Sequence, residues 1–327
     1  MSTTTTAVSV LGAVSPVSRR VRAYFAPVNR VAGAPTVFDA AQMGAFALST
    51  PPVPWVDLGW CSGFVRKSLT KVGALRTGAP SVAQNQVRTE VEATVSLEFE
   101  SWGKLQLALA AGSQQMNLLV TMASAAANGS GGVAAAPVAL ATGSTATSLN
   151  VGAAASEFSV GDLVSVDVDY TGQVGFVGSG VSAAYVSSAA AVGSDLNYVR
   201  RISLNVERVV SIASGVLGLA GPLLAGVPGA GMQVSRLVGF VDREGGGFFQ
   251  EWSGVFVMDG EQGDRVIYYY PRLQAMQGSA ESMEVLATPL ERVKLVGAFR
   301  ALPVKDATDG ETVLCFRSYL PGVLRAV

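Results

Sequence analysis

Alternating apolar and polar residues mark one segment of the chain, residues 86–101. From Glu90 onward, apolar side chains occupy every odd position from Val91 to Phe99, and polar or acidic side chains occupy the even positions. Because successive side chains of a strand face opposite sides, this pattern predicts a β-strand with one apolar and one polar face. Like charges at alternate positions repel unless water solvates them, so the polar face is expected to meet water. The carboxylates on this face are those of Glu90, Glu92, Glu98 and Glu100.

A second segment, residues 239–276, also favours β-structure. It holds three runs of β-forming residues, separated by turn-forming stretches at residues 245–247 and 259–263. Glycines and an Asp-Gly pair between such runs are typical of hairpin turns. The sequence therefore predicts strand, turn, strand, turn and strand in this segment.

A third segment, residues 290–322, places basic side chains on one face of a predicted strand. A turn at Asp309 and Gly310 is expected to lead into a final strand over residues 312–319. Because acidic and basic residues nearly balance in the whole chain, we expect the basic side chains to pair with glutamates of a neighbouring strand or subunit. These basic residues are Arg292, Lys294 and Arg300.

Helical spacing appears in one segment, residues 101–111. Trp102, Leu105 and Leu109 recur at intervals of three or four, the first residue is a serine, and Gly112 follows the last apolar position. Serine is a favoured N-terminal cap and glycine a common helix terminator. The sequence therefore predicts one flanking helix here, among elements that otherwise have the period of strands.

The distribution of charge divides the chain into parts. No ionisable side chain stands between Lys104 and Glu157, and the residues that follow are rich in small β-forming types. We therefore expect residues 120–236 to form an inserted β-rich domain, which interrupts a β domain made of residues 49–119 and 237–327.

Two further expectations complete the predicted fold. Within the inserted region, residues 159–177 and 196–212 favour strands. Residues 1–48 alternate short apolar runs with proline and glycine, and are predicted to be an extended arm that packs on an adjacent subunit. The fold class is therefore mainly β: a β-sandwich or barrel with one flanking α-helix and an inserted β-rich domain.

Composition removes most kinds of catalysis from consideration. The chain has no histidine, which excludes the usual general base at neutral pH and the commonest metal ligand. Only 14% of residues are charged while 49% are hydrophobic, so much of the surface is expected to meet protein. The net charge of −1 gives no basic field that would hold nucleic acid tightly. We expect no enzyme activity, and no catalytic, cofactor-binding or metal-ligating residue.

Other features concern the cysteines and the cellular compartment. Cys61 and Cys315 are expected to be buried or half-buried small apolar residues. The N-terminus has no basic region ahead of its first apolar run and so lacks the order of a secretory signal, which favours assembly in a cytoplasm. The most apolar stretch, residues 209–232, is interrupted by glycine and proline, which favours turns over a membrane span.

Three interpretations of the acidic strand face stay open. It is an exposed sheet face, the wall of a water-filled channel, or the carboxylate pair of a glycosidase. If several copies closed their sheets into a ring, the glutamates would give a negative lumen that repels phosphate and lets DNA pass. A glycosidase also uses two carboxylates, but the sequence places no aromatic cluster for a sugar beside them.

These blocks, taken in order, resemble the major tail tube proteins of tailed bacteriophages. The resemblance lies in WVDLGWCSGFVRKSLTKVGALRTGAPSVAQNQVRTEVEATVSLEFESWGKLQLALAAGSQQMN, followed much later by DGEQGDRVIYYYPRLQAM and FRALPVKDATDGETVLCFRSYLP. It is a resemblance of layout: a strand with acidic alternation, a helix, and paired late strands. It covers the two blocks that flank residues 120–236 and includes no catalytic motif.

The resemblance implies a structural subunit that needs no cofactor. In that family six subunits form a ring, their sheets join into a continuous inner β-barrel, and the rings stack into a tube. The helix would then lie outside the sheet, a long loop over residues 50–78 would reach the next ring, and residues 120–236 would face outward. The residues that would line the lumen are Glu90, Glu92, Glu98 and Glu100.

The same resemblance implies partners and a location. The partners would be further copies of the chain, the tape measure, tail terminator and baseplate proteins, and DNA in transient, non-specific passage, with no membrane. The location would be the tail of a virion, assembled in the host cytoplasm. The additional residues 120–236 leave open whether a contractile sheath protein surrounds the tube.

Three other functions share some of these features. A capsid decoration protein or a head-to-tail joining protein would also be β-rich, poor in charge and free of histidine. A carboxylate-dependent hydrolase would rely on Glu98 and Glu100. A binding module would present residues 120–236 to a cell surface.

Overall fold

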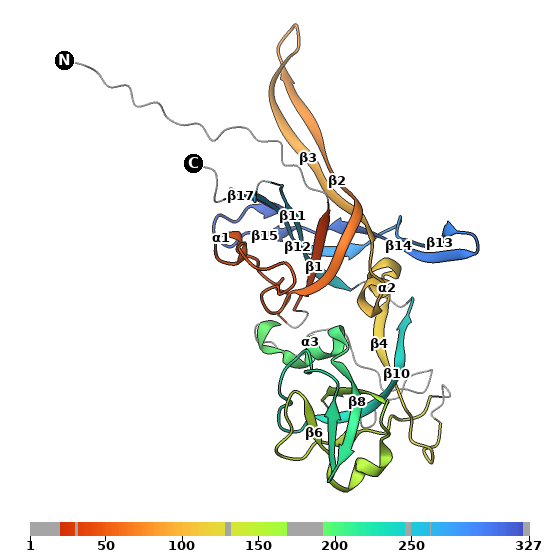
Figure 1. The fold of residues 1–327 in the computed structure, drawn as a ribbon. Helices are drawn as coiled ribbons and strands as arrows, with labels where there is room; N and C mark the ends of the chain where they lie inside the picture. The colour runs from red at the N-terminus through yellow and green to blue at the C-terminus, as the bar shows by residue number, and fades with distance from the viewer. Residues whose placement is uncertain are drawn as a thin grey trace, which may run out of the picture.

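The chain folds into antiparallel sheets with a few short helices, which confirms the predicted mainly β class (Figure 1). The computed structural model describes residues 20–29, 32–127, 132–168, 192–245, 250–261 and 263–322. Outside these ranges lie residues 1–19 of the predicted arm, residues 169–177 of a predicted strand, and part of the turn at residues 245–247. Within them, no helix is both long and apolar enough to cross a membrane.

The larger sheet has eight strands in the order β13-β14-β3-β2-β1-β11-β12-β17. These strands are β1 (Val21–Pro27), β2 (Val56–Thr77), β3 (Val82–Phe99), β11 (Glu251–Asp259), β12 (Arg265–Ala275), β13 (Ala280–Ala287), β14 (Leu290–Ala301) and β17 (Phe316–Leu320). β12 also pairs with β14, for example through Leu273 and Ala301. The strands in the order β14-β3-β2-β1-β11-β12 therefore form a closed cycle of pairings. Hairpin β11–β12 confirms the turn that the sequence predicts at residues 259–263.

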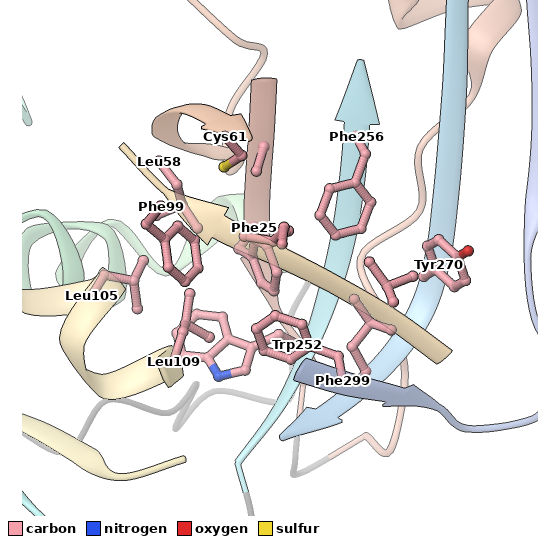
Figure 2. Packing of buried hydrophobic residues seen from close by; sticks show 14 of the residues in the cluster. Phe25, Leu58, Cys61, Phe99, Leu105, Leu109, Trp252, Phe256, Tyr270 and Phe299 are labelled. Carbon is pink, nitrogen blue, oxygen red and sulfur yellow. The ribbon is translucent and has the colours of Figure 1, made fainter. Parts of the chain in front are cut away.

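Aromatic and aliphatic side chains from six of these strands share one core (Figure 2). The ring centroid of Phe25 on β1 lies 5.4 Å from that of Phe299 on β14 and 5.8 Å from that of Phe256 on β11. All three rings are fully buried, and each such burial contributes about 1.5–3 kcal/mol. The helix that follows β3 adds Leu105 and Leu109 to this core.

The smaller sheet has seven strands and a second core. Its strands are β4 (Gln114–Leu119), β5 (Val138–Ala139), β6 (Ser148–Asn150), β7 (Leu163–Asp167), β8 (Val206–Ala213), β9 (Val216–Leu219) and β10 (Gln233–Arg243). The second core includes Leu149, Val164 and Val234. β4 and β10 pair with each other. Because β10 runs from Gln233 to Arg243, the predicted domain boundary between residues 236 and 237 falls inside this strand.

The helices are α1 (Ala40–Met43), α2 (Lys104–Ala111) and α3 (Leu196–Ser203), with 3-10 turns at Gly152–Glu157 and Val192–Ser194. α2 confirms the predicted helix and its end, because Gly112 takes a left-handed φ of 67° after the last turn. Its predicted start is wrong. Gly103 is the N-cap, in extended conformation, so neither Ser101 nor Trp102 belongs to the helix.

α3 is a correction within residues 196–212, for which the sequence favours strands. The carboxylate of Asp195 accepts a hydrogen bond from the backbone N–H of Tyr198 at 3.0 Å, and Leu204 ends the helix with a positive φ. Tyr198 and Ile202, four residues apart, are buried on one side of the helix. Capping and this apolar stripe outweigh the β-propensity of the segment, and only β8 forms a strand.

The predicted N-terminal arm over residues 1–48 is wrong for its described part. β1 lies between β2 and β11 in the larger sheet, and six of its seven residues are buried. Beyond β1, Phe38 packs its ring 5.6 Å from that of Trp55, next to α1. The apolar runs of this segment therefore serve the core of their own chain.

Two other expectations change. The predicted loop over residues 50–78 is mostly β2, a strand of 22 residues that pairs with β3. The predicted final strand over residues 312–319 is broken into two pieces. Its first piece, β16 (Thr312–Val313), pairs with β15 (Val304–Lys305) in a separate small sheet, and its second, β17, joins the larger sheet.

Both cysteines are free, and their burial agrees with the prediction. Cys61 is buried in the larger core and Cys315 is half-buried at its margin. Burial raises the pKa of the Cys61 thiol to about 12, so the thiol stays protonated and unreactive at neutral pH.

A buried lysine lies where the two sheets meet. The Nζ atom of Lys104, at the start of α2, donates a hydrogen bond of 2.7 Å to the Oδ1 atom of Asn117 on β4, and another to the carbonyl oxygen of Arg201 on α3. Burial lowers the pKa of Lys104 to about 7, although the nearby carboxylate of Asp167 opposes the shift. Figure 1 shows α3 between the two sheets, so this ammonium group links three elements of the junction.

We expect Lys104 to make the free energy of unfolding rise between about pH 7 and pH 8.5. The unfolded chain holds this proton up to a pKa of 10.5, whereas the folded chain releases it near 7, so the unfolded chain binds more protons in this window. The contribution to the slope is at most about 1.4 kcal/mol per pH unit. Urea unfolding at several pH values measures it in the wild type and in Lys104→Met, whose slope should be smaller. Equal slopes in the two proteins would contradict the lowered pKa of the buried Lys104.

Candidate functional site

Hairpin β2–β3 extends well beyond the core of the larger sheet (Figure 1). Its outer part, residues 67–90, is here called the basic arm. Almost every side chain of the arm is exposed, on both faces of the two strands. The exposed apolar side chains include Leu69, Val72, Leu75, Val82 and Val87. A two-stranded ribbon with no core on either face is marginal in water, and exposed apolar surface of this kind is typical of interaction sites.

A second hairpin, β13–β14, has a similar tip. Its residues 280–291 are here called the acidic hairpin, and they contain three glutamates and no basic residue. Four large apolar side chains of this tip are more than half exposed, those of Met283, Val285, Leu286 and Leu290. β13 stands at the end of the larger sheet and pairs only with β14 among the described strands. Its outer edge is therefore free to accept another strand.

The register of β14 on β3 places the two hairpins at opposite ends of the sheet. Leu295 pairs with Phe99 and Arg300 pairs with Thr94. From this paired region, β3 continues past Thr94 toward the tip of the basic arm. β14 continues the other way, past Leu295 toward the tip of the acidic hairpin. The strands are thus staggered, and each end of the sheet carries one projecting hairpin.

The predicted alternation along β3 is confirmed from Glu92 to Phe99. The apolar side chains at 93, 95, 97 and 99 are at most 5% exposed, whereas those at 92, 94, 96 and 98 are half-buried. Closer to the tip of the hairpin, no core covers this apolar face of β3. Val91, for example, is 48% exposed. Glu90 lies on the basic arm, and Glu100 follows the last residue of β3.

Each of the four predicted glutamates forms an ion pair within the chain. On β14, Arg300 pairs with Glu92 at 3.0 Å and Lys294 pairs with Glu98 at 2.6 Å, both across to the neighbouring strand β3. This confirms the predicted pairing of the β14 cations with glutamates. The remaining pairs are Glu98 with Arg292, Glu90 with Lys71, and Glu100 with Arg20.

These pairs make the polar face charge-compensated, and it is not uniformly acidic. Register places Lys67 and Lys71 of β2 opposite Thr94 and Glu90, on the same face as the glutamates. Hydrogen bonds from Arg292 to Glu284, and from Lys294 to Glu98, raise the pKa of each cation, so both stay charged at neutral pH. The face therefore presents alternating charges of both signs to water.

A shallow pocket adjoins the inner end of this face. It has a volume of about 310 Å³ and is lined by Glu98, Glu100, Trp102, Arg292 and Lys294, among others. Trp102 is 57% exposed, and its ring centroid lies 5.5 Å from that of Phe240 on β10. The carboxylate of Glu98 contacts two cations at this pocket, those of Arg292 and Lys294.

Sequence reasoning found the glutamates but missed the two hairpins. The arm was hidden because its exposed valines and leucines have the same alternation as residues of a buried strand. One signal was present: residues 67–90 hold four basic residues against a single acidic one, in a chain whose charges otherwise balance. Comparison with models of known protein families and with curated proteins finds no match for this chain.

Proposed function

We propose that the chain is a structural subunit of a phage tail tube, which assembles into rings that stack around a central channel for DNA. The observation that carries this proposal is the pair of staggered hairpins, both rich in exposed apolar residues. A monomer leaves these surfaces in water, whereas an assembly buries them against other copies. The sequence resemblance to tail tube proteins agrees with such a role.

In this proposal, strands β13, β14, β3 and β2 form the wall of the channel. They are neighbours in the larger sheet, and their shared polar face is open to water. In a ring, adjacent copies would bring this part of the sheet together edge to edge and extend it into a continuous inner barrel. Core strands β1, β11 and β12 would back this wall and complete the subunit barrel.

The wall that we propose is charge-compensated, in place of the acidic wall that the sequence predicts. Cations of this face, such as Arg292, Lys294 and Arg300, are engaged by glutamates of the same chain. Phosphate binding depends on cations that neutralise phosphates and release their counterions. Since these cations already have carboxylate partners, DNA would pass with little attraction to the wall. Glu90, Glu92, Glu98 and Glu100 would then act in the lumen by neutralising basic neighbours.

The smaller sheet would face away from the channel. Residues 120–236 supply most of that sheet, which is joined to the rest of the subunit through β4, β10 and the packing of α3. By this proposal it is an inserted outward-facing domain. The tape measure, tail terminator and baseplate proteins would contact the inner wall and the two ends of the tube, in the tail of a virion.

Electron microscopy of the purified full-length chain tests the proposal. We expect stacked rings or tubes of uniform diameter at micromolar concentration, because the two hairpins bury apolar surface only in an assembly. Isolated trimers would favour a capsid decoration protein instead. A protein that stays monomeric at all concentrations would contradict the tube.

A further inference from the structure

The two projecting hairpins carry opposite charge. The basic arm holds Lys67, Lys71, Arg76 and Arg88 against the single carboxylate of Glu90. The acidic hairpin holds Glu281, Glu284 and Glu291 and has no basic residue between positions 280 and 291. The rest of the chain has nearly balanced charge, with a total of −1. The separation of charge is thus concentrated at the two tips.

Several of these charges have no partner inside the described part of the monomer. On the arm, Arg76 and Arg88 are exposed and form no ion pair with any described residue. On the acidic hairpin, the same holds for Glu281 and Glu291, whereas Glu284 pairs with Arg292 at 2.7 Å. Like charges crowded on one ribbon repel each other, and a ribbon of opposite sign relieves that repulsion.

Apolar side chains accompany the charges on both tips. The arm exposes Val72, Leu75 and Val82, and the acidic hairpin exposes Met283 and Leu286. A contact between the tips would therefore bury apolar surface and pair unmatched charges together. Apolar burial supplies affinity in such interfaces, and charge complementarity sets orientation and association rate.

Because the hairpins project from opposite ends of the sheet, they cannot meet within one copy, but they can meet between two copies arranged head to tail. We infer that the basic arm of one copy docks on the acidic hairpin of the next copy along the assembly axis. This inference rests on the proposed function, and it names the partner surface for each exposed tip. Such a contact joins two different surfaces, so it repeats from copy to copy in one direction and gives an open assembly where its rotation does not close into a ring.

Charge reversal tests this contact. The first variant, Glu281→Lys with Glu291→Lys, makes both tips basic, and the second, Arg76→Glu with Arg88→Glu, makes both acidic. We expect each variant alone to lose the long assemblies that wild-type protein forms, as measured by sedimentation and electron microscopy. All these positions are exposed, so circular dichroism and the melting temperature should stay close to wild type.

Two recombinations make the test specific. The variant that carries all four substitutions has an acidic arm and a basic hairpin, and it should regain assembly. A mixture of the two reversed variants should also assemble, because each arm then finds a hairpin of opposite sign in the other variant. Glu157→Lys with Glu311→Lys is the control matched to the first variant, since it makes the same change in net charge at exposed positions away from both tips.

The outcomes separate this contact from the tube itself. Wild-type protein that never assembles contradicts both the tube and the contact. Tubes that form equally well in both reversed variants, or a fourfold variant that stays dispersed, overturn the contact and leave the tube standing. Binding of a short DNA duplex that Arg76→Glu with Arg88→Glu abolishes, with assembly unchanged, would assign the basic arm to nucleic acid and overturn the inference.

Discussion

Replacing residues 72–89 with an Asn-Gly turn should abolish assembly while leaving the monomer folded. The change removes most of the basic arm and keeps the pair between Lys71 and Glu90, which would hold the register of the shortened hairpin. Asn-Gly favours the tight turn that joins two antiparallel strands. The deleted residues are exposed on both faces except for the half-buried Gly73, so the free energy of unfolding should change by only about 0.5 kcal/mol.

Two measurements on this variant are decisive. Electron microscopy should show no tubes under conditions in which the wild type forms them, and urea unfolding should give nearly the same midpoint for both proteins. A matched control shortens the polar loop around Asp309 and Gly310, which lies outside both hairpins, and should leave assembly intact. Normal tubes from the truncated arm would show that assembly depends on other surfaces.

Phe25→Ala should have the largest effect on stability. Phe25 is fully buried on β1 and packs against Phe256 and Phe299 from two other strands of the larger sheet. Loss of a buried phenylalanine removes its transfer free energy and leaves a cavity, which together cost about 3–5 kcal/mol. Urea unfolding measures this difference directly.

The control for Phe25→Ala is Val37→Ala, at a position that follows β1 and is 66% exposed. Its free energy of unfolding should stay within about 0.5 kcal/mol of the wild type. If Phe25→Ala were equally mild, β1 would not belong to the core, and the N-terminal segment would be an arm as the sequence predicts.

Sequence periodicity predicted the elements whose environment lies within the chain. The alternation around Val95 and Leu97 was correct because one face of β3 meets its own core and the other meets water. Hairpin β11–β12 was predicted from its turn residues, which act locally. The ion pairs of Arg300 and Lys294 followed from the overall balance of charge.

The failures have two different physical causes. α3 was missed because the cap at Asp195 and the buried stripe of Tyr198 and Ile202 compete with β-propensity, and tertiary packing decides between them. The basic arm was missed for another reason. Residues such as Leu75 and Val87 read as core positions, yet nothing in the described part of the monomer covers them. A pattern in one chain does not reveal whether its partner belongs to the same chain or to another.

The stagger between β3 and β14 gives any linear assembly two different ends. One terminus would present the unmatched arginines of the basic arm, and the other would present the unmatched glutamates of the acidic hairpin. Growth from a surface then requires that surface to offer charge of one sign, and a protein that stops growth has to offer the other. Initiator and terminator would therefore be non-interchangeable, and this polarity would already be encoded in a single subunit.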